Sequence, residues 1–240
     1  GRAASVSATG RVKPAPVVAA AQLRRNSMAK DIYVVAHTQS QHHVDRLVGG
    51  WYDSPLTEFG RRQADAIAGR IAEMVGDRRP IEIYSSDLLR AAQTAEPIAA
   101  RLGAPVTHWS DLRERSYGVA GGKPDSWLDG RVVFVGKDGD RLDHRDGIEG
   151  AETKREFLTR IYRAMDRIVA SPCATQVVVT HGFAMTFVVA AWIGMPLESA
   201  GWVNFRSNAG GITHLREDDE LFNRTVMSLN DRAHLANVLA

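Results

Sequence analysis

Three short apolar runs, rich in β-branched residues, constrain the fold of this chain more than any other feature. They span residues 32–35, 81–84 and 176–179, and each is followed by a short turn and then by helical periodicity. Runs of this length and composition are typical of strands buried on both faces of a parallel sheet. Strands that alternate with helices predict a wound, mostly parallel α/β sheet flanked by helices, in a single domain over residues 28–240.

The expected helices follow from apolar residues spaced three and four positions apart. One covers residues 60–74, and another covers 88–102, where we expect Pro97 to bend or break it. Two more are expected at 152–170 and 182–193, and a late strand at 208–215.

Residues 1–27 differ from the rest of the chain in composition. They hold five of the 30 basic residues and none of the 28 acidic ones, so the remainder has 25 basic against 28 acidic residues. We interpret 1–27 as a disordered leader added by a cloning vector, with an acid-poor transit peptide as the alternative. Because the excess positive charge lies in this leader, we expect no nucleic-acid partner.

Composition excludes several further classes of protein. The only cysteine is Cys173, so no internal disulfide framework and no cysteine-based metal cluster can form. The longest apolar stretch, 183–195, is too short to cross a bilayer. We therefore expect a reduced, cytoplasmic protein without a membrane partner.

Between residues 117 and 150 the periodic pattern is lost among Gly, Asp, Lys and Pro. A long segment of this kind in a compact domain is often a lid or a binding loop, although a plain surface excursion remains the alternative.

Polar side chains follow each of the three expected parallel strands. His37 follows the first strand, Arg90 lies one turn into the helix after the second, and His181 follows the third. Ligands of wound sheets bind at the carboxyl ends of the strands, so these residues should converge there. A neutral imidazole can attack phosphorus, and a guanidinium can form bidentate hydrogen bonds with phosphate oxygens. This convergence predicts phosphoryl transfer through a phosphohistidine.

Six sequence stretches resemble the histidine phosphatase superfamily, the phosphoglycerate mutase-like proteins. They are VVAHT at 34–38, GGWYDSPLTEFGRRQA at 49–64, YSSDLLRAAQTA at 84–95, LRERSYG at 112–118, GAET at 150–153 and VVVTHGF at 177–183. They occur in the order and spacing of that family.

The resemblance implies roles for individual residues and no cofactor or metal. His37 matches the phosphorylated nucleophile, Arg90 the phosphoryl clamp, Glu114 the proton donor to the leaving oxygen and His181 the second histidine, which steadies transition-state charge. Thr38, His43, Arg46, Arg115 and Asn208 match positions in or near the substrate pocket.

The chain departs from the family where Ala36-His37-Thr38 replaces Arg-His-Gly. Losing such an arginine contact costs on the order of 2–4 kcal/mol of transition-state stabilisation. His43 stands where the family commonly has Asn, and Leu47 replaces another arginine, although Arg46 is adjacent.

Three explanations of Ala36 remain open. It could be an engineered substitution, a natural divergence in which His42, His43 or Arg46 supplies the missing charge, or a sign that catalysis has been lost. The concurrent changes at 38, 43 and 47 favour divergence. Adjacent histidines in a strand would point to opposite sides, so His42 and His43 are not expected to share a metal ion.

We therefore expect a phosphomonoesterase that acts on a small phosphorylated metabolite through His37. The alternatives are a catalytically impaired binder of a phosphorylated ligand, a mutase, or a hydrolase of another ester. The presence of all four catalytic-type residues favours an enzyme. Trp192 and Trp202 could belong to the core or to a homodimer interface.

Overall fold

The computed structural model describes residues 29–239 and contains one six-stranded sheet. The strand order is β3-β2-β4-β1-β5-β6, and the strands are β1 (Lys30–Ala36), β2 (Ile81–Ser85), β3 (Val106–His108), β4 (Thr175–Thr180), β5 (Ile212–Glu217) and β6 (Arg224–Asp231). The first four strands in this order run parallel, and β5 pairs antiparallel with both β1 and β6. The prediction of a wound, mostly parallel sheet is confirmed. The expected leader, 1–27, lies outside the described residues.

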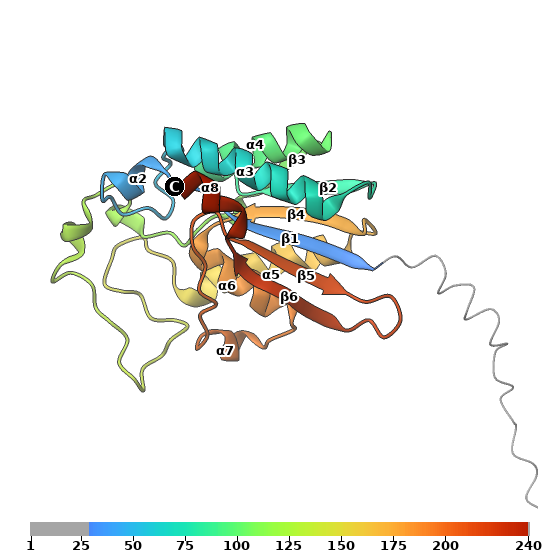
Figure 1. Cartoon of the computed structure of the whole chain (residues 1–240). Coiled ribbons are helices and arrows are strands. Elements are labelled where there is room, and N and C mark those ends of the chain that lie inside the picture. Colours follow the sequence, from blue (N-terminus) through green and yellow to red (C-terminus); the bar gives the residue numbers. More distant parts are fainter. Residues whose placement is uncertain (1–28, 240) are drawn as a thin grey trace, which may run out of the picture.

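Helices cover both faces of the sheet (Figure 1). Along β1, Ile32 and Val34 belong to the core beneath α5 (Lys154–Ala170) and α6 (Gly182–Trp192). Tyr33 and Val35 belong to the opposite core, with α3 (Glu58–Val75) and α4 (Leu89–Leu102). Successive strand residues face opposite sides, so an unbroken apolar run is what a strand between two helical layers requires.

Helix α4 runs without interruption through Pro97, so the expected break is wrong. Pro97 removes one backbone donor, but Ala95 and Ile98 on either side of it are fully buried in the core shared with α3. Tertiary packing therefore keeps the helix continuous despite the local cost.

The late strand, expected at 208–215, begins only at Ile212. Asn208 instead opens a turn in which its carbonyl accepts a hydrogen bond from the Gly211 amide, and Gly210 has a φ of +76°. Strands β3 and β6 and the short helix α2 (Gln41–Val44) were not expected from the sequence pattern. The remaining short helices are η1 (Ser110–Leu112), α7 (Leu197–Ala200), η4 (Ala233–Leu235) and α8 (Ala236–Leu239).

The segment between 117 and 150 carries two short 3-10 helices, η2 (Gly118–Ala120) and η3 (Asp125–Leu128), and a small core of its own. That core joins Ala120 and Ile148 to Val48, which lies in the loop after α2. The Val48 amide donates to the Lys123 carbonyl, and the Val48 carbonyl accepts from the Gly122 amide. The segment is therefore attached to the loop after α2 and projects beyond the sheet on that side (Figure 1).

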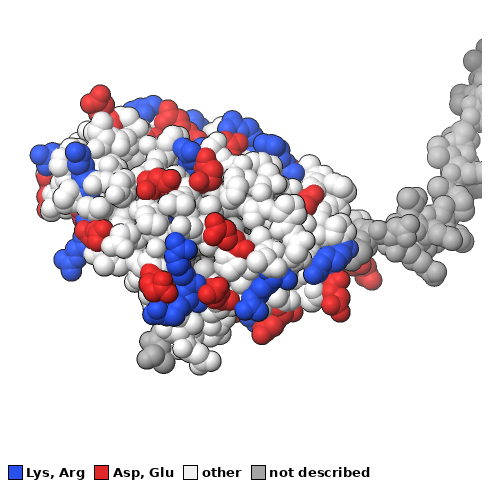
Figure 2. All heavy atoms as spheres, turned by 90° about the horizontal axis from the view of Figure 1, so that it is seen from above, with Lys and Arg blue, Asp and Glu red and all other residues white. Residues whose placement is uncertain are grey.

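Residues 29–239 contain no helix long and apolar enough to cross a membrane. On the face formed by α3 and α4, basic and acidic side chains alternate, as Figure 2 shows. Arg70 and Glu73 form an ion pair of 3.3 Å on α3.

Candidate active site

His37 lies directly after β1, at the carboxyl ends of the parallel strands. Its amide donates to the Thr180 carbonyl at the end of β4, which fixes the backbone at the point where the ring leaves the sheet. The ring Nδ1 lies 2.8 Å from the Thr38 carbonyl. A carbonyl can only accept, so Nδ1 carries the proton and Nε2 keeps its lone pair. Burial, Arg90 and His43 together hold the pKa of His37 well below its usual value, so the ring is neutral at pH 7.

Arg90 projects from the first turn of α4 toward that lone pair. Its Nε donates to His37 Nε2 over 3.2 Å, and its two terminal nitrogens donate to the carbonyls of Gly50 (2.6 Å) and Tyr52 (2.9 Å). The side chain is almost entirely buried, which lowers its pKa to about 10. Arg90 therefore stays charged at neutral pH and lies next to the unprotonated nitrogen of His37.

His181, between β4 and α6, lies beside His37 with 5.0 Å between the ring centroids. Its Nε2 is 2.8 Å from the Ser86 hydroxyl, which already accepts from the Leu88 amide. The hydroxyl can donate to this nitrogen or accept from it, because a hydroxyl oxygen has one proton and two lone pairs. Among the described residues, Nδ1 has no hydrogen-bond partner. His181 is fully buried, so this ring nitrogen is shielded from solvent.

Glu114 is held at the edge of the same site by the start of α6. One carboxylate oxygen accepts from the Phe183 amide and the other from the Arg115 amide, each over 2.9 Å. Burial raises the pKa of Glu114, although these amides and the nearby Arg90 act in the opposite direction. A raised pKa suits a carboxylic acid that must give up a proton near neutral pH.

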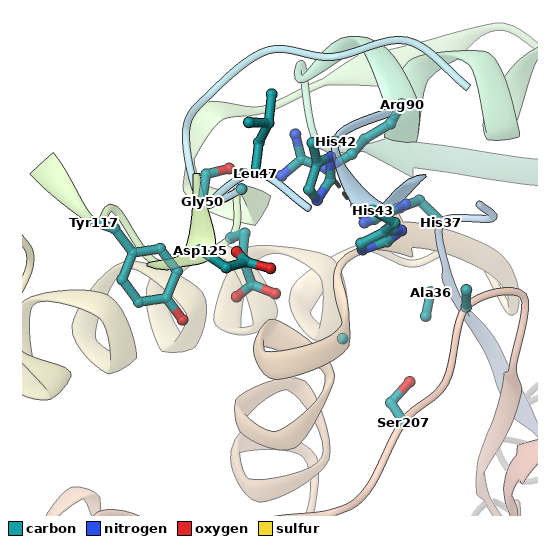
Figure 3. Close-up of a pocket in the computed structure, with 14 residues that line it drawn as sticks. Ala36, His37, His42, His43, Leu47, Gly50, Arg90, Tyr117, Asp125 and Ser207 are labelled. Atoms are coloured by element: carbon teal, nitrogen blue, oxygen red, sulfur yellow. Dashed lines mark hydrogen bonds between the residues drawn. The ribbon is translucent and has the colours of Figure 1, made fainter. Parts of the chain in front are cut away.

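These side chains open on a cavity of about 390 Å³ (Figure 3). His37, His43, Arg90 and Glu114 line it, whereas His181 lies behind the wall and its neighbour Gly182 takes part in the lining. The other lining residues are Ala36, His42, Leu47, Gly49, Gly50, Tyr117, Asp125, Ser207 and Ala209. Among all these lining residues, Arg90 is the only arginine or lysine.

His42 and His43 lie on α2 and not on a strand, so the expectation that they point to opposite sides is wrong. Their ring centroids are 4.2 Å apart, and both rings reach the cavity wall because residues one apart on a helix differ by only about 100°. Burial, together with the charges of His43 and Arg90, lowers the pKa of His42 to about 3. Burial and Arg90 also lower the pKa of His43, against the opposing effect of Asp125.

Four of the residues expected in the pocket do not line this cavity. The Thr38 hydroxyl turns away and donates to the Gly60 carbonyl over 2.8 Å. Arg46 is exposed at a positive φ of 53°. The backbone N–H of Asn208 donates a hydrogen bond to the side-chain oxygen of Asn230. Arg115 lines a neighbouring cavity instead, and there it pairs with an aspartate.

Asp125 is the residue that sequence reasoning missed most clearly. It lies at the start of η3, in the segment where no periodic pattern could place it, yet its carboxylate faces the cavity (Figure 3). Within residues 29–239, no group of three or more His, Cys, Asp or Glu side chains is arranged to hold a metal ion.

His37 after β1, Arg90 in the helix that follows β2 and His181 after β4 come together at one edge of the sheet, which is the arrangement that the resemblance to histidine phosphatases implies. In agreement, the sequence profile of the histidine phosphatase superfamily (branch 1) matches residues 32–231. The chain therefore belongs to that superfamily.

Individual relatives are phosphatases, hydrolases and mutases by name. The chain is 29% identical to the Yersinia pestis protein named "Probable phosphoglycerate mutase GpmB", over 85% of this chain and 94% of that protein. It is similar to the structure titled "Mycobacterial hydrolase 1", with a TM-score of 0.69 and 25% identity over 86% of this chain and all of that one. It is also similar to a mycobacterial glucosyl-3-phosphoglycerate phosphatase, with a TM-score of 0.67 and 26% identity over 85% of this chain and all of that one.

Proposed function

We propose that this protein is a phosphomonoesterase that hydrolyses a small phosphorylated metabolite through a phosphohistidine at His37. The observation that carries the proposal is the unprotonated Nε2 of His37, which is held 3.2 Å from the guanidinium of Arg90 at the wall of a cavity. A neutral nucleophile and a fixed cation on one wall suit attack on an anionic phosphorus centre.

In the first step, Nε2 of His37 attacks phosphorus while the bond from phosphorus to the ester oxygen breaks. Arg90 donates to the non-bridging oxygens as charge moves onto them, and His181, which packs beside the His37 ring, helps to stabilise that charge. Glu114, with its pKa raised by burial, gives its proton to the leaving oxygen, so the product is a neutral alcohol.

In the second step, a water molecule attacks the phosphohistidine. The Glu114 carboxylate takes a proton from this water, the bond between phosphorus and His37 breaks, and inorganic phosphate leaves. A second hydroxyl in place of water would accept the same phosphoryl group, which is how a mutase would use this site.

Ala36 favours one other candidate, a protein that binds a phosphorylated ligand without turnover. Its methyl group lines the cavity where the family's arginine would project, so one charged contact to the phosphoryl group is missing. His42 and His43 reach the same cavity and would bind a dianionic group more strongly when protonated. We place the protein in a reducing, cytoplasmic setting, which suits a single, buried, free cysteine.

The test is the intact mass of the protein after incubation with phenyl phosphate and a rapid quench in alkaline denaturant, which preserves the acid-labile bond between phosphorus and the imidazole nitrogen. We expect one phosphoryl adduct, together with released phenol, and we expect His37→Ala to lose both. His108→Ala, at an exposed position on β3, is the matched control and should keep both. Phenol release without any adduct, or an adduct that persists in His37→Ala, contradicts the proposal.

A further inference from the structure

A second cavity, of about 450 Å³, adjoins the catalytic one. Tyr117 lines both, and Arg115, in the wall of the second cavity, directly follows Glu114, in the wall of the first. The two cavities therefore share Tyr117 as a common wall, and that wall lies three positions along the chain from the residue we assign as the proton donor.

The second cavity is lined mainly by apolar side chains from the segment between 117 and 150. Leu128, Val132 and Ile148 form its inner wall, and the same residues pack in the small core of that segment. Phe134 also lines the cavity, yet its side chain is 84% exposed. An aromatic ring left this open gains by packing against an apolar ligand, because that contact removes both surfaces from water.

The charges in the wall of the second cavity do not favour binding of an anion. The one cation in its wall, Arg115, is paired with Asp146 at 2.7 Å and donates to the Glu152 carbonyl as well. Asp129 adds a second carboxylate to the same wall. Asp125 lies between Tyr117 and His37 in the first cavity (Figure 3), so a leaving group moving toward Tyr117 passes another negative charge.

Chemistry fixes which part of the substrate reaches this space. In a phosphoryl transfer the leaving oxygen lies opposite the attacking atom, roughly in line with it. His37 lies at one side of the catalytic cavity and Tyr117 at the other (Figure 3). The alcohol moiety of the ester thus points toward Tyr117 and into the second cavity. Burial and Glu114 raise the pKa of Tyr117 to about 12, so its phenol stays neutral beside that moiety.

We infer that the second cavity is a leaving-group subsite, and that the substrate is a phosphate monoester of a bulky apolar alcohol without a carboxylate. This inference rests on the proposed function. The volume of the second cavity is in the range of small-molecule pockets and suits a group of two or more rings. Phosphoglycerate, which carries a carboxylate on a short polar chain, matches neither the lining nor the charge.

The test compares three esters of similar leaving-group chemistry: phenyl phosphate, 2-naphthyl phosphate and a carboxylated 2-naphthyl phosphate. We expect kcat/KM to be at least tenfold higher for the naphthyl than for the phenyl ester, and the added carboxylate to remove most of that gain. Phe134→Ala should lower the naphthyl-to-phenyl ratio about five- to tenfold. Val133→Ala is the matched control, since Val133 is exposed but does not line the cavity.

A binding measurement separates failure of this inference from failure of the proposed function. The probe is 2-naphthyl phosphonate, which cannot be hydrolysed, measured by titration calorimetry beside methylphosphonate. Tighter binding of the naphthyl compound that weakens in Phe134→Ala and not in Val133→Ala supports the subsite, even for a protein that turns nothing over. Equal affinities for both probes, or equal kcat/KM for all three esters, overturn the subsite while leaving the phosphohistidine mechanism intact.

Discussion

Replacing Ala36 by arginine is the perturbation that best probes how this site differs from its family. The Ala36 side chain lines the catalytic cavity next to His37, and Arg90 is the only arginine or lysine in that lining. A second guanidinium there would donate to the phosphoryl group as its charge shifts in the transition state. Contacts of this kind are worth about 2–4 kcal/mol in sites that exclude water.

The gain must exceed the cost of ordering the new side chain, which is up to about 2 kcal/mol. With a gain of about 3 kcal/mol and the full ordering cost of about 2 kcal/mol, the net stabilisation is about 1 kcal/mol, so we expect kcat/KM for phenyl phosphate to rise roughly fivefold in Ala36→Arg. Ala36→Met, which fills similar space without charge, is the control and should not raise it. The assay is release of phenol at substrate concentrations below KM, alongside thermal unfolding of each variant.

Two results would refute this reasoning. If Ala36→Arg folds with an unchanged melting temperature and shows no gain, the site does not lack a cation at that position. If Ala36→Met gains as much as Ala36→Arg, filling the cavity rather than adding charge is responsible.

Two further predictions follow from the buried ionisable groups. The pKa of His42 is about 3 in the folded protein against 6.5 in the unfolded chain, so below pH 6.5 the unfolded chain binds more protons and His42 lowers stability as pH falls. In His42→Gln we therefore expect the free energy of unfolding to fall by about 1 kcal/mol less between pH 7 and pH 5.5 than in the unmodified protein. Urea unfolding at both pH values measures this, His108→Gln is the control, and an unchanged pH slope contradicts it. Glu114→Gln should lower kcat/KM about 100-fold for an alkyl phosphate but far less for p-nitrophenyl phosphate, whose leaving group needs no proton; equal losses would exclude Glu114 as the proton donor.

The sequence predicts the parts of the fold and site that depend on short-range pattern. An apolar run buried on both faces identifies β1, β2 and β4, and polar residues directly after such strands must share one edge of the sheet. His37 and His181 could be placed together on that ground alone. Glu114 could not, because it follows no strand and was assigned by family resemblance.

Other features escaped the sequence because tertiary contacts decide them. Strand β6 alternates exposed and partly buried residues and forms only by pairing with β5, so its own pattern is weak. Asp125 reaches the cavity only because the loop after α2 forms backbone hydrogen bonds with the segment that holds it. The exposure of the Arg46 side chain could not be predicted either, because it depends on the left-handed backbone conformation at this residue.

The hydrogen bonds of Arg90 and His181 give these two residues different evolutionary meanings. Arg90 ties α4 to the loop at Gly50 and Tyr52, so selection for a stable fold would retain it in a descendant that had lost all activity. His181 keeps a buried Nδ1 without a partner among the described residues, which costs the folded state about 1–3 kcal/mol. Selection for stability alone would replace such a histidine with a better-packed residue. A histidine at this position therefore costs stability, and its benefit must lie in what the cavity binds or transforms.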